Sequence, residues 1–250
     1  MTTLAQVKRV TRKLLDRNSD LALVSGRLVV VKPVRHILRG VFISSRDPII
    51  HLPVWFVTSL FKPGAVPHDR WGERLFRKWG VPHNVDDPPE VHLERMRMVS
   101  AITRLPVHEQ RYPDDWPTWV DNHPMIVTEM CEVIEEQALP MLRPLQSIDD
   151  FVAFTADQTR FPWTRLGAGY FDEPFVFAAQ GNFEAALAAC TRLVAEVPTG
   201  PATKELLRLL AGGDRHGVAQ WLHGWEADSV KRLKLEEYWE PTPFPIEATA

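Results

Sequence analysis

The chain has 250 residues, of which 45% are hydrophobic and 24% charged, and its formal net charge is -3. This length allows one large or two small domains with their own cores, and the composition is that of a globular protein rather than a disordered one. Two cysteines are too few for a disulfide framework, and no apolar run approaches the roughly 20 residues of a membrane-spanning helix, so we expect a cytoplasmic protein without a membrane span.

An amphipathic helix is predicted near the start of the chain, over residues 4–17. Apolar side chains recur there at steps of three and four residues, and the opposite arc is basic. The apolar stripe consists of Leu4, Val7, Val10 and Leu14, and the basic arc of Lys8, Arg9, Arg12 and Lys13. Such a helix can bind a nucleic acid or a membrane surface, or it can dock on its own chain with the basic arc in solvent.

The charges are distributed unevenly along the sequence. Residues 1–40 carry a formal charge of +7, whereas residues 107–160 carry -8. This polarity has two interpretations: an anionic partner binds the basic end, or the two oppositely charged segments face each other within the chain.

Four short antiparallel strands are predicted after the first helix. β-branched residues dominate the region, and Gly or Pro interrupts it at regular points. The expected strands cover residues 20–24, 27–32, 35–44 and 51–61, with a tight turn at Ser25-Gly26 between the first two. Together with the helix, they predict an α+β front of two layers.

The third strand carries a second candidate binding surface. Strand alternation places Arg35 and Arg39 on the same face as Ile37, and His36 on the other. These cations can contact phosphate, or they can pair with carboxylates of the acidic segment. Residues 1–40 contain no Trp, Tyr or Phe, so aromatic stacking on bases is not expected there.

The rest of the chain is predicted to be helical. A helix is expected at 69–79, and a proline-rich break follows, which divides the chain into an α+β domain, 1–85, and a helical domain, 90–250. A further helix over 125–139 should begin at Pro124 and end at Pro140. Ser147 and Asp150 form a capping-box pattern that predicts another helix start.

Two helical hairpins are predicted near the C-terminus. The stretch AAQGNFEAALAACTRLV contains Gly181-Asn182, and about 32 residues later Gly212-Gly213-Asp214 separates two more helices. Residues 165–235 loosely resemble tetratricopeptide-type hairpins, partly matching at Ala178, Gly181, Phe183, Ala185 and Ala186. The resemblance implies two hairpins that pack on the rest of the chain. The run EEQALPMLRPLQSIDDFVAF also resembles stretches of bacterial proteins of unknown function that pair an α+β front with a helical back, which implies a fold but no activity.

The densest polar cluster lies in HEQRYPDDWPTWVDNHP. Its candidate ligands for zinc or manganese are His108, Asp114, Asp115 and His123, but no HExxH helix or second cysteine at metal spacing supports them, so no metal or other cofactor is expected. The alternative is a solvated loop anchored by Trp116 and Trp119. Cys131 and Cys190 fall on apolar helix faces, where buried thiols are normally inert.

The sequence favours a non-enzymatic interaction or regulatory protein. It contains no GxSxG, GxxxxGK[ST] or GxGxxG pattern, whereas its charges are polarised and its hairpins are typical of protein-binding surfaces. We expect a protein partner in a charged groove between the two domains. The expected binding residues are Lys8, Arg9, Arg12, Lys13, Arg35, Arg39, Trp116 and Trp119. The alternatives are a metal-dependent hydrolase that uses the 108–123 loop and a nucleic-acid-binding protein that uses the first helix.

Overall fold

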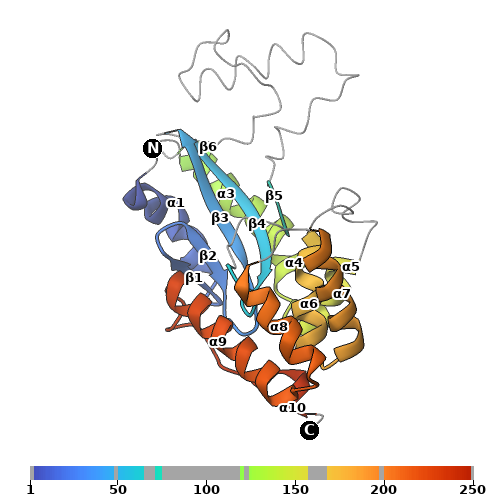
Figure 1. Cartoon of the computed structure of the whole chain (residues 1–250). Coiled ribbons are helices and arrows are strands. Elements are labelled where there is room, and N and C mark those ends of the chain that lie inside the picture. Colours follow the sequence, from blue (N-terminus) through green and yellow to red (C-terminus); the bar gives the residue numbers. More distant parts are fainter. Residues whose placement is uncertain are drawn as a thin grey trace. The chain divides into compact units, whose positions relative to one another are not determined.

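The computed structural model describes residues 3–47, 50–64, 71–74, 119–120, 124–156, 168–196 and 200–248. The predicted fold class is confirmed, because a small antiparallel sheet near the N-terminus is followed by a mostly helical C-terminal part (Figure 1).

Two compact units alternate along the chain. The first unit comprises Met1–Val29, Gly40–Trp55 and Gly72–Met141, and the second comprises Val30–Arg39, Phe56–Trp71 and Leu142–Ala250. The predicted domains, 1–85 and 90–250, follow one another instead, and their boundary lies outside the described residues.

Helix α1 spans Leu4–Arg17, as predicted. Thr3 caps it in a reciprocal box with Gln6, in which the Gln6 N–H donates to Thr3 Oγ1 at 3.3 Å and the Thr3 N–H donates to Gln6 Oε1 at 2.6 Å. Val7, Val10 and Leu14 are buried, and α1 contacts β1 and α3. The prediction is wrong for Leu4, which is 56% exposed. Thr11 is buried on the inward side as well, and its hydroxyl donates to Val7 O at 2.8 Å.

The sheet has six strands in the described part of the chain. They are β1 (Leu21–Val24), β2 (Leu28–Val31), β3 (Ile37–Asp47), β4 (Ile50–Ser59), β5 (Trp71–Arg74) and β6 (Trp119–Val120). Strands β1 to β5 neighbour one another in sequence order, and β6 pairs with β4 in antiparallel register through Ile50–Val120 and His51–Trp119. The first four strands are confirmed, with small shifts at their ends.

Two local predictions about the sheet have clear outcomes. The tight turn is confirmed, since Ser25 and Gly26 have φ of 50° and 73° and the Arg27 N–H donates to Val24 O, which is the geometry of a type I′ hairpin turn. The helix predicted over 69–79 is wrong for 71–74, which form β5, because pairing with the sheet outweighs the local helical pattern.

The helix beginning at Pro124 is confirmed, but it does not end at Pro140. It runs as α3 (Pro124–Val133), a π-helical turn η3 (Ile134–Ala138) and α4 (Leu139–Leu142). A proline inside an α-helix lacks an N–H and its ring clashes with the carbonyl four residues earlier. We attribute the passage through Pro140 to the wider π turn just before it, in which the Leu139 N–H bonds to Ile134 O.

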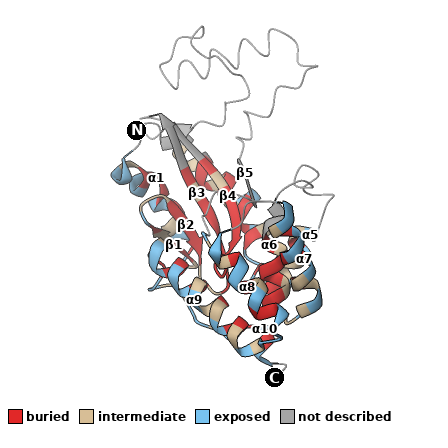
Figure 2. Ribbon diagram, in the orientation of Figure 1, coloured by how far each residue is buried: buried red, intermediate tan, exposed pale blue. Residues whose placement is uncertain are grey.

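The second unit is built around a group of helices. They are α5 (Ile148–Ala156), α6 (Ala168–Ala179), α7 (Phe183–Glu196), α8 (Pro201–Ala211), α9 (Arg215–Leu233) and α10 (Pro245–Ala248). Both predicted hairpins are confirmed, with φ of 77° at Gly181 and 67° at Gly213 in the α6–α7 and α8–α9 turns. Successive helices from α5 to α9 pack together, and α6 also contacts α9 and α10, so α6 lies at the buried centre of this group (Figures 1 and 2).

The start of α5 confirms the predicted capping box. The Asp150 N–H donates to Ser147 Oγ at 3.0 Å, and the Ser147 N–H donates to Asp150 Oδ2 at 2.9 Å. The pKa of Asp150 is lowered, mainly by the hydrogen bond from the Ser147 hydroxyl, although burial opposes this effect. The Ser147 and Gln146 N–H groups and the charge of Arg39 lower the pKa further.

The lowered pKa of Asp150 predicts a contribution to acid sensitivity. A carboxyl group whose pKa is lower in the folded chain stabilises it above its unfolded pKa, near 3.8, and this contribution is lost as the pH falls through the folded value. We expect Asp150→Asn to lose stability at neutral pH and to show a shallower loss between about pH 5 and pH 2 than the wild type. Urea unfolding across this range measures both effects. Asp149→Asn, which removes a charge from the same turn, is the control, and identical acid slopes for Asp150→Asn and the wild type would contradict the assignment.

The two sides of α1 should respond differently to substitution. Val10 is 1% exposed, so Val10→Asp should lower the free energy of unfolding by more than about 3 kcal/mol, because it removes apolar burial and adds an unpaired buried charge. The Arg12 side chain is 82% exposed, so Arg12→Glu should change it by less than about 1 kcal/mol. Chemical denaturation compares the two variants, and equal losses would show that the basic arc is internal.

Candidate functional site

The four basic side chains predicted on α1 reach the surface of the first unit. Lys8, Arg9, Arg12 and Lys13 are all exposed, and we call them the cationic face of α1. Two of these side chains make long polar contacts: Arg12 Nε lies 3.9 Å from Asp16 Oδ2, and Lys13 Nζ lies 3.4 Å from Thr128 Oγ1. Contacts of this kind contribute little in water, so Arg12 and Lys13 can exchange them for a partner at low cost.

The C-terminal end of α1, in contrast, pairs with the acidic segment. Arg17 donates two hydrogen bonds to Glu135, from Nε to Oε1 at 3.1 Å and from Nη2 to Oε2 at 2.8 Å. The Asn18 side chain donates to the same Oε1 at 2.6 Å. Within the first unit, therefore, one cation of the basic segment faces the acidic segment of the same chain, while the cationic face points to solvent.

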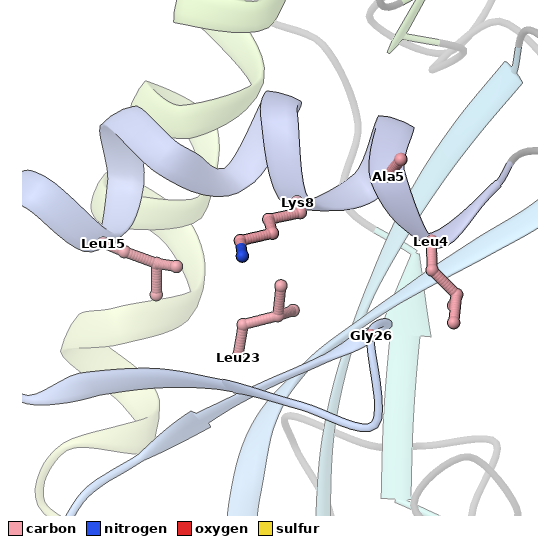
Figure 3. Close-up of a pocket in the computed structure, with 6 residues that line it drawn as sticks. All are labelled: Leu4, Ala5, Lys8, Leu15, Leu23 and Gly26. Carbon is pink, nitrogen blue, oxygen red and sulfur yellow. The ribbon is translucent and has the colours of Figure 1, made fainter.

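An apolar pocket lies beside the cationic face. Its volume is about 370 Å³, and it lies between α1 and the β1–β2 hairpin (Figure 3). The lining residues are Leu4, Ala5, Lys8, Leu15, Leu23 and Gly26. Leu4, Lys8 and Leu15 extend from α1 toward the hairpin, and the Lys8 side chain points toward Leu23 (Figure 3). The pocket thus joins an apolar wall to a cation.

Gly26 is required at the tip of this hairpin for two reasons. Its φ of 73° is a conformation that side-chain-bearing residues rarely adopt, and a Cβ atom there would lie 2.6 Å from Leu4 Cδ2. A larger residue would therefore displace Leu4 from the pocket wall.

The side chains of the second predicted surface, around the third strand, differ in how far they are buried. Arg35 and His36 precede β3, which starts at Ile37, so the predicted strand alternation does not apply to them. Arg35 Nη2 lies 3.1 Å from Glu240 Oε2. Glu240 belongs to the C-terminal segment and not to the acidic segment, residues 107–160. Arg39 is only 2% exposed, and its charge helps to lower the pKa of Asp150.

His36 belongs to a polar cluster in the second unit that the sequence analysis did not predict. Its Nδ1 lies 2.9 Å from Oε1 of Glu226, a residue of α9 that is 0% exposed. Its Nε2 lies 3.0 Å from Thr242 Oγ1 and 3.3 Å from Pro243 O. On the other side, His223 Nδ1 lies 3.8 Å from Glu226 Oε2, and His223 Nε2 lies 2.9 Å from Glu247 Oε2.

This cluster attaches the C-terminal segment to the second unit. The His36 ring stacks on Phe244 at 4.1 Å between centroids, and Phe61 meets Phe244 edge to face at 5.3 Å. The backbone adds hydrogen bonds from the Val34 N–H to Tyr238 O at 2.9 Å and from the Glu240 N–H to Val34 O at 2.8 Å. Burial acts to raise the pKa of Glu247. Hydrogen bonds from the Phe244 N–H and His223 and the charges of His223 and His36 act against it, and the pKa is lowered overall.

Thr242, His36 and Glu226 have the order of a hydroxyl, an imidazole and a carboxyl group that nucleophilic enzymes use. Their surroundings favour a structural role instead. Residues 241 and 243 are prolines without N–H groups, so the backbone next to Thr242 lacks the adjacent donors that stabilise an oxyanion.

The two thiols are buried, as predicted. Burial raises the pKa of both Cys131 and Cys190 to about 11, which disfavours the nucleophilic thiolate.

The predicted metal loop lies mostly outside the described residues. This holds for His108, Asp114, Asp115, Trp116 and His123, and for Trp119 only the backbone, in β6, is described. Within the described ranges, no three His, Cys, Asp or Glu side chains are grouped so that they could hold a metal ion, and no helix has the length and apolarity to span a membrane.

Comparison of the chain with protein-family models, with curated proteins and with solved structures found no match.

The sequence of α9 contains one pattern that indicates the polar cluster around His36. Val218, Leu222 and Glu226 follow one another at steps of four residues, so a carboxyl group occupies a position of the buried stripe. Such a position indicates a buried polar contact. Its partner, His36, is 190 residues away in the sequence, and no local pattern identifies it.

The cluster predicts a ranking of stabilities. His36→Phe keeps the ring contact with Phe244 but leaves the buried carboxyl group of Glu226 without its closest partner, so we expect a loss of about 3 kcal/mol in the free energy of unfolding. Arg35→Ala breaks the neighbouring exposed pair with Glu240 and should cost less than about 1 kcal/mol. Urea unfolding tests the order, and a smaller loss for His36→Phe than for Arg35→Ala would refute it.

Proposed function

We propose that this is a non-enzymatic interaction or regulatory protein that binds a partner protein through the cationic face of α1. The observation that supports the proposal is that Lys8, Arg9, Arg12 and Lys13 are exposed beside an open apolar pocket, although Arg17 of the same helix is paired with Glu135. A surface that joins exposed cations to apolar area has the features of a protein-binding site.

Two further features agree with this proposal. The α6–α7 and α8–α9 hairpins are of a kind that commonly supports protein binding. Both cysteines are free thiols, which suits a cytoplasmic partner. The proposed surface lies on α1 and does not depend on the groove between domains that the sequence analysis expected.

Charge reversal of the cationic face tests the proposal. Arg9→Glu with Arg12→Glu should reduce capture of specific partners from a bacterial lysate at least about tenfold, because opposite charges steer and orient the encounter. The matched control is Lys204→Glu with Lys231→Glu, which changes the net charge equally at exposed positions of α8 and α9. Quantitative affinity purification measures the capture, and thermal unfolding confirms that each variant is folded.

The outcomes separate the function classes. Partners lost by the α1 variant and kept by the control support the proposal. The same proteins captured by all three chains would refute it. Capture that nuclease treatment abolishes, and that falls steeply with salt, would favour the nucleic-acid alternative.

A further inference from the structure

The described residues leave the pocket beside α1 open and incompletely covered. Leu4 is 56% exposed, and Leu15 and Leu23 are half-buried, so three leucine side chains present apolar area to solvent in one place. Gly26 has no side chain, so the hairpin tip does not clash with Leu4 beside it. Filling this pocket with one apolar side chain would remove that area from water.

The charges beside the pocket restrict what can fill it. Lys8 is part of the lining, and Arg12, one turn further along α1, has an 82% exposed side chain. A ligand whose apolar group enters the pocket therefore places its neighbouring atoms next to cations. The complementary ligand has a carboxylate adjacent to a large apolar group.

A membrane surface fits this site less well than a protein. Leu4 is the one large hydrophobic side chain that is exposed among the described residues, whereas an interfacial helix inserts a continuous apolar face into the bilayer. A nucleic acid also fits less well, because the Asp16 carboxylate, 69% exposed, lies beside Arg12 and would repel phosphates, and the pocket lining contains no aromatic ring on which a base could stack.

We infer that the partner bound by the cationic face is an acidic protein segment that inserts one large apolar side chain into this pocket and sets a carboxylate against Lys8. This inference rests on the proposed function and specifies its partner. The inserted side chain acts as the central anchor, and Lys8 and Arg12 form a charged rim, which is the arrangement that concentrates binding energy in protein interfaces.

Blocked peptides test the inference on the full chain. The probes are an acidic hexapeptide with one tryptophan, the same peptide with alanine in its place, a short oligothymidylate, and vesicles of phosphatidylcholine and phosphatidylglycerol. Amide shifts of Leu4, Lys8, Leu23 and Gly26 in NMR titrations report binding at the pocket. The tryptophan peptide should bind at least about tenfold more tightly than the alanine peptide, because it alone buries a large side chain.

Two variants separate the pocket from general charge attraction. Leu23→Gln should remove the preference for tryptophan, whereas Leu207→Gln, at a half-buried position of α8, should keep it. Lys8→Ala should weaken both peptides several-fold, since it removes the cation that meets the carboxylate.

Several results would overturn the inference. These are equal affinity for the two peptides, no shift at the pocket amides, or tighter binding of the oligonucleotide or the vesicles at those amides. The proposed function is decided separately, by the loss of partner capture in the charge-reversed α1 variant. Partner capture that depends on α1 without any preference for tryptophan would therefore refute the pocket and leave the proposed function standing.

Discussion

The burial of the Glu226 carboxyl group is the constraint on which the arrangement of the second unit depends. A fully buried carboxyl group is unfavourable unless polar partners surround it. Here His36 Nδ1 lies 2.9 Å from Oε1, whereas His223 Nδ1 lies 3.8 Å from Oε2, beyond hydrogen-bond distance. Both imidazoles also contact the C-terminal segment, His36 at Thr242 and His223 at Glu247. The contacts of one carboxyl group with two imidazoles thus connect the segment before β3, helix α9 and the C-terminal segment.

Helix α1 illustrates how packing leaves a surface available for binding. Its stripe of Val7, Val10 and Leu14 is buried, and the Arg17–Glu135 pair adds directional contact at one end. Apolar burial supplies most of this stability, because each such side chain contributes roughly 1.5 to 3 kcal/mol and a solvated ion pair much less. The basic arc is therefore not needed to hold the helix in place, and it can serve another purpose.

The elements that depend on neighbouring residues were predictable from the sequence. Helix α1, the Ser25-Gly26 turn, the Ser147–Asp150 capping box and both C-terminal hairpins follow local rules of periodicity, turn conformation and capping. The predictions failed at two places, one where a distant contact outweighed a local preference and one where the helix geometry changed locally. Residues 71–74 pair with the sheet instead of forming a helix, and the helix continues through Pro140 because a π turn relieves the clash.

For the candidate site, the sequence by itself determined the cationic face, because helical periodicity places Lys8, Arg9, Arg12 and Lys13 opposite the apolar stripe. It did not determine the pocket, whose wall combines Leu4 and Leu15 with Leu23 of the β1–β2 hairpin. Nor did it identify the partners of His36 and Arg35, which lie 190 and 205 residues away. Only the tertiary structure decided these features, because a pocket and a buried polar contact form from side chains that separate parts of the chain bring together.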